Sequence, residues 1–280
     1  MKLLCLSLLL ALASAGVIPK DGLPELILGG TEARPGQFPW QVVIQSYKNG
    51  GVVKCGGAIL TPKHILTAAH CTPSFKQDSW VTIGTVDMND KTSPAYQVYN
   101  LESYVAHSNF SMENRMHDDI AVVTINGSIQ MSGYAYPTII FKDDSRLLAE
   151  KEAVVSGFGM TSNDQNQLVR NSKLLFAQIP LYSQSHCESQ VNKVTGGWAL
   201  FWDKQICAGD YFKGTYAGDS GGPIHVRSGG RYFQVGVTSY GSTNRSPLNA
   251  DQKTYPGVYT RLSQYCDFLS EKTDGGFGCR

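Results

Sequence analysis

The sequence predicts an all-β protein built from two barrels. From about residue 27 onward, short runs of β-branched and aromatic residues alternate with Gly, Pro, Asn and Asp turns, a pattern typical of antiparallel strands. Around residues 136–150 the sequence turns polar and charged between two strand-rich halves, as expected of a crossover between barrels. With 280 residues, 42% of them hydrophobic, the chain is long enough to bury a substantial core.

The clearest strand candidates follow one another along the whole chain. They are residues 41–45, 80–83, 121–125, 153–156 and 232–238. One helix is expected, over residues 262–269 near the end of the chain. No fixed-period repeat interrupts this order, so a repeat architecture is excluded.

The first residues have the pattern of a secretory signal peptide. Lys2 supplies a positive start, residues 3–12 an apolar run and residues 13–15 a small-residue cleavage site. We expect residues 1–15 to be removed, which leaves Gly16 first. The run is shorter than the roughly 20 apolar residues of a membrane-spanning helix, so no membrane association is expected after signal removal. The sequence therefore predicts a secreted, extracellular protein.

Export changes the interpretation of the cysteines, because thiols outside the cytosol usually pair. One of the seven lies in the signal peptide, and no Cys-x-x-Cys cluster of a zinc site is present, so no metal is expected. The remaining six permit fifteen pairings. They are Cys55, Cys71, Cys187, Cys207, Cys266 and Cys279. Asn-x-Ser sequons at Asn109, Asn126 and Asn244 also fit an exported glycoprotein.

The overall charge excludes a general electrostatic partner. Lysines and arginines number 24 against 23 acids, a net charge of +1, so neither nucleic acid nor an anionic membrane is an expected partner. Specificity must therefore come from a local site.

Three short segments point to one kind of chemistry when they are considered together. His70 lies in the segment TAAHC, Asp119 in DDIAVV and Ser220 in GDSGGP. Each alone has an ordinary structural explanation, as a surface or core histidine, an acidic turn and a glycine-rich turn. Jointly they supply a nucleophile, a base and an orienting carboxylate, which is the set needed for acyl transfer.

On these motifs the chain resembles the chymotrypsin-like (trypsin) family of serine peptidases, from residue 27 to about residue 269. The resemblance implies two six-stranded antiparallel β-barrels with a C-terminal helix and an active site between the barrels. It implies that Ser220 is the nucleophile, His70 the general base and then acid, and Asp119 the residue that orients the imidazole. The aspartate of the family stands directly before Ile-Ala-Val or Ile-Ala-Leu, which selects Asp119 over Asp118. No cofactor is implied.

The same resemblance assigns supporting residues. The backbone N–H groups of Gly218 and Ser220 would form the oxyanion hole. The segment Ser239-Tyr240-Gly241 matches the strand that pairs with the substrate, with tyrosine in place of the usual tryptophan. The family implies the disulfides Cys55–Cys71 and Cys187–Cys207, and Cys266–Cys279 is left as the remaining pair.

Activation by proteolysis is also implied. The segment ILGG at residues 27–30 resembles the amino terminus that family members gain when a propeptide is removed, and the new ammonium group of Ile27 would pair with Asp219. This divides the chain into a signal peptide (1–15), a propeptide (16–26) and a peptidase domain (27–280). Leu26 precedes the cut where most relatives have arginine or lysine, so self-activation is expected instead of a trypsin-type activator.

Three glycines predict the primary specificity. Gly214 takes the position six before the nucleophile, and Gly241 and Gly257 match the walls of the pocket, which predicts an open, uncharged slot for large apolar or aromatic side chains. Tyr216 stands where the family commonly has a cysteine, so the bridge across the pocket is expected to be absent.

Two alternatives to this function stay open from the sequence. Asp251 or Arg245 could fold toward the pocket, and Asp251 would then favour substrates with Arg or Lys. A catalytically inactive relative could act as a secreted binding module, although no triad residue is missing. For the enzyme, the expected partners are protein or peptide substrates and protein inhibitors of proteases, and a monomer is expected.

Overall fold

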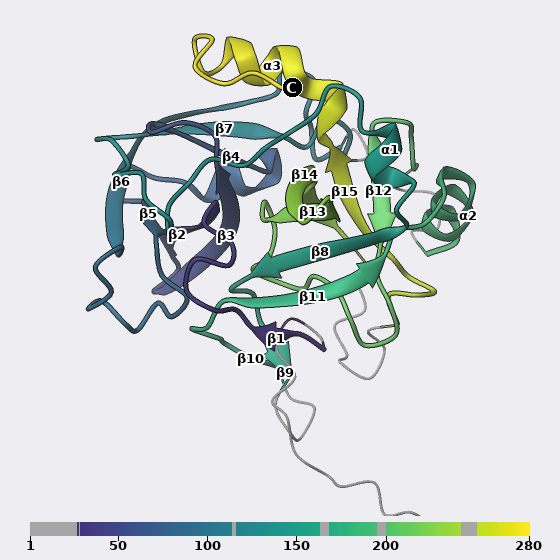
Figure 1. The fold of residues 1–280 in the computed structure, drawn as a ribbon, viewed down its shortest axis with the longest axis horizontal. Coiled ribbons are helices and arrows are strands. Elements are labelled where there is room, and N and C mark those ends of the chain that lie inside the picture. The colour runs from purple at the N-terminus through teal and green to yellow at the C-terminus, as the bar shows by residue number, and fades with distance from the viewer. Residues whose placement is uncertain (1–26, 28, 114–115, 163–167, 195–199, 242–250) are drawn as a thin grey trace, which may run out of the picture.

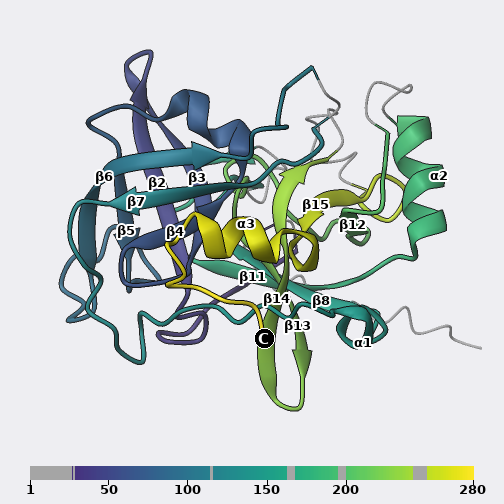
Figure 2. The same ribbon diagram turned by 90° about the horizontal axis from the view of Figure 1, so that it is seen from above.

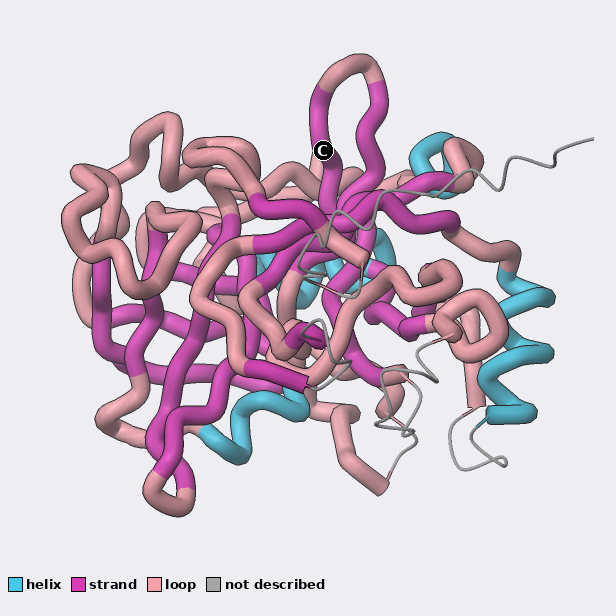
Figure 3. The backbone as a smooth tube through the Cα atoms, turned by 90° about the horizontal axis from the view of Figure 1, so that it is seen from below, coloured by secondary structure: helices cyan, strands magenta, loops and turns pink. Residues whose placement is uncertain are grey.

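The computed structural model describes residues 27, 29–113, 116–162, 168–194, 200–241 and 251–280. The expected signal peptide and propeptide, including Leu26, lie outside the described residues, as do Asn244 and Arg245. Within the described part, strands dominate and the helices lie at the periphery (Figure 3).

The first half of the chain forms a closed barrel of six antiparallel strands, in the order β2-β3-β4-β7-β6-β5 (Figure 1). The strands are β2 (Gln41–Lys48), β3 (Gly51–Ile59), β4 (His64–Thr67), β5 (Trp80–Ile83), β6 (Gln97–Ala106) and β7 (Ala121–Ile125). Val42, Ile44, Ile65 and Val81 are buried inside this barrel. Closure leaves no unpaired sheet edge, so the barrel is a firm base for loops that carry function.

The second half forms a seven-stranded antiparallel sheet, in the order β1-β11-β8-β13-β14-β15-β12. Its strands are β1 (Thr31–Glu32), β8 (Glu152–Gly157), β11 (Leu175–Pro180), β12 (Gln205–Ala208), β13 (Pro223–Ser228), β14 (Arg231–Tyr240) and β15 (Gly257–Arg261). A single bridge between Leu181 and Ala208 joins β11 to β12 and closes the six strands β8 and β11–β15 on themselves. The expected second barrel is therefore present, with β1 added along β11.

Short elements complete the fold. A two-stranded ribbon pairs β9 (Thr161–Ser162) with β10 (Leu168–Val169). The helices are η1 (Ala69–Ser74), α1 (Ser145–Leu148), α2 (Gln184–Val194), η3 (Leu262–Tyr265) and α3 (Cys266–Glu271). The expected helix over residues 262–269 therefore begins as a tight 3₁₀ turn and continues as an α-helix to residue 271.

The C-terminal helix returns to the first barrel after the chain has built the second (Figure 2). Tyr265, Cys266 and Leu269 are buried in the same apolar cluster as Ile65 and Val122 of the first barrel. In addition, Arg280 N–H donates to the carbonyl of Ile140 on the crossover segment. The chain end thereby holds both barrels and their connection together.

Three disulfides join described residues, Cys55–Cys71, Cys187–Cys207 and Cys266–Cys279. The first two are the pairs expected from the family resemblance, and the third is the pair that remained. Cys187–Cys207 ties the polar helix α2 to β12, and Cys266–Cys279 ties the start of α3 to the chain end. In the part of the chain that the structure describes, no helix is long and apolar enough to cross a membrane.

His225 is a buried histidine of the second barrel that lies outside the predicted triad. It is fully buried on β13, its ring lies 4.4 Å from the ring of Trp40 (centroid to centroid), and its Nδ1 has no hydrogen-bond partner among the described residues. Burial lowers the pKa of His225 to about 3, so the imidazole stays neutral in the folded protein.

We predict that His225 makes the protein acid-sensitive. Below pH 6.5 the unfolded chain binds a proton at this residue, whereas the folded chain binds it only at about pH 3. The free energy of unfolding therefore decreases as the pH is lowered from 6.5 to 3. In His225→Phe, the loss of unfolding free energy between pH 7 and pH 4 should shrink by about 3 kcal/mol. Urea unfolding at both pH values measures this, and equal losses in the two proteins would contradict it.

Candidate active site

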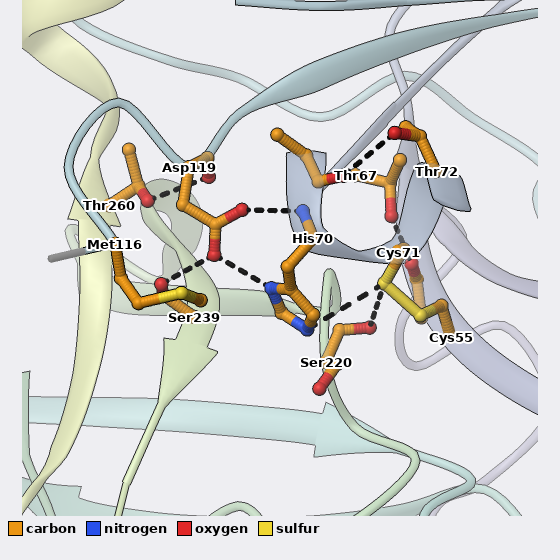
Figure 4. A network of polar contacts seen from close by, with 12 residues as sticks. Cys55, Thr67, His70, Cys71, Thr72, Met116, Asp119, Ser220, Ser239 and Thr260 are labelled. Carbon is orange, nitrogen blue, oxygen red and sulfur yellow. Dashed lines mark hydrogen bonds and ion pairs between the residues drawn. A yellow bond between two sulfur atoms is a disulfide. The ribbon is translucent and has the colours of Figure 1, made fainter. Parts of the chain in front are cut away.

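The three predicted catalytic side chains meet between the two barrels. His70 lies in η1, directly after β4, and Asp119 lies two residues before β7, so both come from the first barrel. Ser220 precedes β13 of the second barrel, and its side chain lies beside the His70 ring (Figure 4). The fold thus brings together three residues that are separated by up to 150 positions in the chain.

Asp119 is the most completely bonded residue of the site. Its side chain is fully buried, one oxygen accepts the backbone N–H of His70 at 2.8 Å, and the other lies 2.7 Å from Nδ1 of His70 (Figure 4). From the second barrel, Ser239 donates its hydroxyl to the carboxylate, and Thr260 donates to the backbone carbonyl at 2.8 Å. The carboxylate is therefore fixed in position and accepts from Nδ1, which leaves Nε2 of His70 to exchange protons.

The neighbouring Asp118 has a different role. Its carboxylate accepts a hydrogen bond from the Tyr265 hydroxyl at 3.0 Å and lies 3.7 Å from the ammonium group of Lys204. Tyr265 lies in the C-terminal turn η3, and Lys204 lies directly before β12. Asp118 therefore ties a loop to the C-terminal segment, and Asp119 alone reaches the imidazole.

The His70 pKa reflects two opposing effects. Burial of the ring disfavours its cation, but the charge and hydrogen bond of Asp119 overcome this and hold the pKa of His70 above its usual 6.5. A base of raised pKa accepts the serine proton more readily and is neutral above that pKa.

The Ser220 loop is held by close backbone approaches between the barrels. Gly56 of β3 donates its N–H to the carbonyl of Ser220 at 2.7 Å, and a Cβ on Gly56 would lie 2.6 Å from Gly222. Gly221 has φ of +79°, and a Cβ there would meet the Thr67 hydroxyl. Glycine is required at both positions, because a side chain would force the barrels apart.

Gly218 has the backbone conformation of a glycine-only position, with φ of +97°. It lies two residues before Ser220, and a Cβ there would approach Gly159 to 3.1 Å. The neighbouring Met160 N–H is bonded to Ala217. The course of the loop that leads to Ser220 therefore depends on glycine at position 218.

Asp219 lies under this loop as a buried carboxylate. Its two oxygens accept the backbone N–H groups of Gly159 and Tyr216, each at 2.9 Å, and only about 1% of its surface is exposed. Burial raises the pKa of Asp219 to about 6, although the two N–H donors and the charge of Lys54 oppose this. Among the described residues no cation lies within ion-pair distance of Asp219.

Ile27 is also buried, although it lies at the start of the described chain. Its exposed fraction is 1%, and it packs in the apolar cluster of the second barrel with Leu147, Val155 and Tyr259. The next glycine, Gly29, has φ of +66°, and a Cβ there would collide with Phe212 and Lys213. The segment therefore inserts into the second barrel on the side of the loops that precede Ser220.

The predicted specificity residues lie around one polar side chain that the sequence did not identify. A Cβ on Gly214 would lie 1.8 Å from Oε1 of Gln252, and a Cβ on Gly257 would lie 3.4 Å from the same atom. Gly241 approaches Gly257, since a Cβ on it would lie 3.9 Å from the Cα of Gly257. Gln252 has no motif around it, so only contacts between distant residues could reveal it.

Asp251 takes part in a turn next to Gln252. Its carboxylate accepts the backbone N–H groups of Lys253 and Thr254 and the Thr254 hydroxyl, and these bonds are exposed. These interactions hold the pKa of Asp251 below its usual value against partial burial. The carboxylate is thus committed to its own turn.

The Cys55–Cys71 disulfide forms one wall beside the triad. Cys71 Sγ lies 3.9 Å from Nε2 of His70 and 3.7 Å from the carbonyl oxygen of Ser220 (Figure 4). A pocket opens here, lined by the disulfide, His70, Ser220 and Phe75. Within the described residues, no cluster of three or more His, Cys, Asp or Glu side chains could hold a metal ion.

Comparison with known proteins agrees with this architecture. The family model described as Trypsin matches residues 27–269. A fibrinolytic enzyme, isozyme C, of Lumbricus rubellus is 31% identical over 88% of this chain and 100% of its own length. The CLIP domain-containing serine protease B10 of Anopheles gambiae is 28% identical, over 90% of this chain and 70% of its own. Human serine protease 41 is 27% identical, over 87% and 75% respectively.

We predict that Asp119→Asn lowers kcat by about 10⁴-fold, the loss known for this change in other Ser-His-Asp triads. The amide cannot stabilise the imidazolium, so the pKa of His70 should also fall and the acidic limb of the kcat/KM profile should move to lower pH. A pH profile of the residual activity measures both. Asp118→Asn serves as the control, and an equal loss in that variant would contradict the assignment.

Proposed function

The chain belongs to the trypsin family of serine proteases and is a serine endopeptidase, and we propose that it is a secreted zymogen that cleaves after large apolar or aromatic residues. Residues 1–15 are its signal peptide, residues 16–26 its propeptide and residues 27–280 its peptidase domain. The observation that carries the proposed specificity is that Gly214 and Gly257 lie against a neutral side chain, Gln252, with Gly241 next to Gly257.

The acylation step follows from the geometry of the triad. The Ser220 hydroxyl oxygen bonds to the carbonyl carbon of the substrate while its proton passes to Nε2 of His70, and the carbonyl π electrons move to the oxygen. The oxyanion reforms the carbonyl, the C–N bond breaks, and His70 returns the proton to the leaving amine. Asp119 stabilises the imidazolium that exists between the two transfers, since it is held against Nδ1 throughout.

Deacylation repeats the sequence with water. The water oxygen attacks the acyl carbon as its proton passes to His70, and the bond to Ser220 then breaks as the proton returns to the serine oxygen. The net change is addition of one water across the peptide bond. The pocket beside the Cys55–Cys71 disulfide supports a binding position for the leaving group there, because His70 and Ser220 both line it.

The backbone N–H groups of Gly218 and Ser220 stabilise the oxyanion in this proposal. Each such donor contributes about 3 to 4 kcal/mol to the transition state. The positive φ of Gly218 supports this role, because it gives the loop a backbone conformation that residues with a side chain rarely adopt.

Asp219 supports activation by cleavage between Leu26 and Ile27. A buried carboxylate with two N–H donors but no ion-pair partner among the described residues is under-compensated. The ammonium group that cleavage creates at Ile27 would supply the missing charge, and Ile27 already lies in the core of the same barrel. The ion pair would then hold the oxyanion loop in its active shape.

The slot supports large apolar side chains on energetic grounds. Burial of 150 to 250 Å² of aromatic ring at about 25 cal/mol per Å² stabilises a complex by roughly 4 to 6 kcal/mol before entropy is included. An arginine would lose several kcal/mol of solvation in a slot without a counter-charge. Asp251 is the candidate for that charge, but its carboxylate is bonded within its own turn.

The proposal includes secretion and a monomeric state. The partners are protein or peptide substrates and protein inhibitors of proteases. The three disulfides support an oxidising compartment, because such bonds rarely persist in the cytosol.

We predict that kcat/KM for peptides differing only at the residue before the cut is highest for Phe, Tyr, Trp, Leu or Met. Arg and Lys peptides should be at least tenfold poorer, because no charge meets them in the slot. Ser220→Ala, which should lose fluorophosphonate labelling and turnover, is the control for contaminating proteases. A tenfold advantage for Arg or Lys would refute the specificity and direct mutation to Asp251.

We predict further that active enzyme begins at Ile27, which amino-terminal sequencing measures. Active material that still begins at Gly16 would contradict the ion pair. The pH dependence of stability gives a second readout, since the raised pKa of Asp219 means that the folded precursor binds this proton more tightly than the unfolded chain. Precursor stability should therefore fall by about 3 kcal/mol as the pH rises from about 3 to about 7, and cleavage should remove most of this loss.

A further inference from the structure

Gln252 replaces the side chain that Gly214 lacks. Its exposed fraction is 8%, and its carboxamide lies against Gly214 and Gly257 while its Cβ lies against Gly209. A Cβ on Gly209 would lie 2.5 Å from the Cβ of Gln252, and one on Gly214 would lie 1.8 Å from Oε1. The space beside Gly214 and Gly257 is therefore occupied by a side chain that enters from the segment before β15, not from the segment before Ser220.

The orientation of this amide is fixed by its neighbours. Nε2 donates to the carbonyl oxygen of Thr215 at 2.7 Å, and exchange of the two amide atoms would put oxygen against oxygen there. The Thr215 hydroxyl is paired with the Tyr259 hydroxyl at 3.2 Å, so one of these two groups donates to the other. Oε1 is thus the atom presented between Gly214 and Gly257.

Oε1 is buried and accepts no hydrogen bond from any described residue. Buried acceptors are normally satisfied, so an unsatisfied one at a binding site marks a place where a ligand donor gains more than it would in water.

We propose that Gln252 is a specificity-determining residue whose Oε1 accepts a hydrogen bond from the end of the substrate side chain, so that the enzyme prefers tyrosine to phenylalanine before the cut. The inference rests on the proposed function, because it takes an aromatic side chain in the slot as its starting point. The tyrosine ring supplies apolar burial and its neutral hydroxyl supplies the donor. A cation is less suited, because a single neutral amide does not replace its lost hydration.

The test compares matched peptides with Tyr, Phe or O-methyltyrosine before the cut. O-methyltyrosine keeps the ring oxygen but cannot donate. In the wild-type enzyme we expect kcat/KM for Tyr to exceed that for both others by roughly tenfold, equivalent to about 1.4 kcal/mol. Equal values for Tyr and Phe would overturn the inference while leaving the proposed preference for aromatic residues intact.

Two substitutions then assign the effect to Gln252. Gln252→Met keeps the length but removes the acceptor, so the Tyr/Phe ratio should fall to about one. Gln178→Met, on the exposed face of β11, is the matched control and should keep the wild-type ratio. An unchanged ratio in Gln252→Met would overturn the assignment.

Gln252→Glu is a second variant of the same size that carries a charge in place of the amide. It should raise kcat/KM for Arg peptides relative to Phe peptides by at least tenfold, and no change would mean that residue 252 does not face the substrate. Fluorophosphonate labelling of Ser220 counts the active sites in each variant and so separates misfolding from altered preference. A wild-type enzyme that favours Arg would refute the proposed function, whereas the Tyr/Phe ratio still decides the role of Gln252.

Discussion

The proposed active site depends on one buried carboxylate that joins the two barrels. Asp119 belongs to the first barrel, but Ser239 of β14 and Thr260 of β15 bond to it from the second. Burial of a charge is costly unless every lone pair is used, and here both carboxylate oxygens and the backbone carbonyl have donors. The same bonds that satisfy Asp119 also set the position of one barrel against the other, so the catalytic geometry and the domain interface form a single structural unit.

Asp219 is the opposite case of the same chemistry. It is just as buried, but its donors are two backbone N–H groups, and its pKa is raised to about 6. An incompletely compensated buried charge contributes little to stability. It is suited to regulation, because a new cation nearby changes the free energy of the charged form by several kcal/mol. The fold therefore contains one carboxylate suited to constant geometry and one suited to a change of state, both close to Ser220.

The primary slot follows a third principle, in which glycines make room for a side chain from elsewhere. Gly209 and Gly214 lie in the connection between β12 and β13, Gly257 begins β15, and each lies close to Gln252. Any larger residue at Gly214 would collide with the Gln252 amide, so the two positions must change together. In the proposed slot, specificity is consequently a property of the pair Gly214 and Gln252, not of Gly214 alone.

The all-β class, five of the strands and the three residues of the proposed triad could be predicted from the sequence. Strands such as Trp80–Ile83 and Ala121–Ile125 are recognisable because burial imposes local patterns of β-branched residues, and the triad is recognisable because its glycine and alanine neighbours are needed for close backbone approach. The predicted helix was found near the chain end, with only its first turn of a different type.

Only the tertiary structure decided the features that arise from contacts between distant segments. The helix α2 has only three apolar residues, Cys187, Val191 and Val194, which is too few to mark it as a helix, and it is tied to β12 by Cys187–Cys207. The addition of β1 beside β11, the hydrogen bond between Asp118 and Tyr265, and the entry of Gln252 beneath Gly214 likewise have no local signal. The physical reason is the same in each case: such interactions depend on which groups are brought together when the barrels close, and a linear pattern records only what each residue requires of its neighbours in the chain.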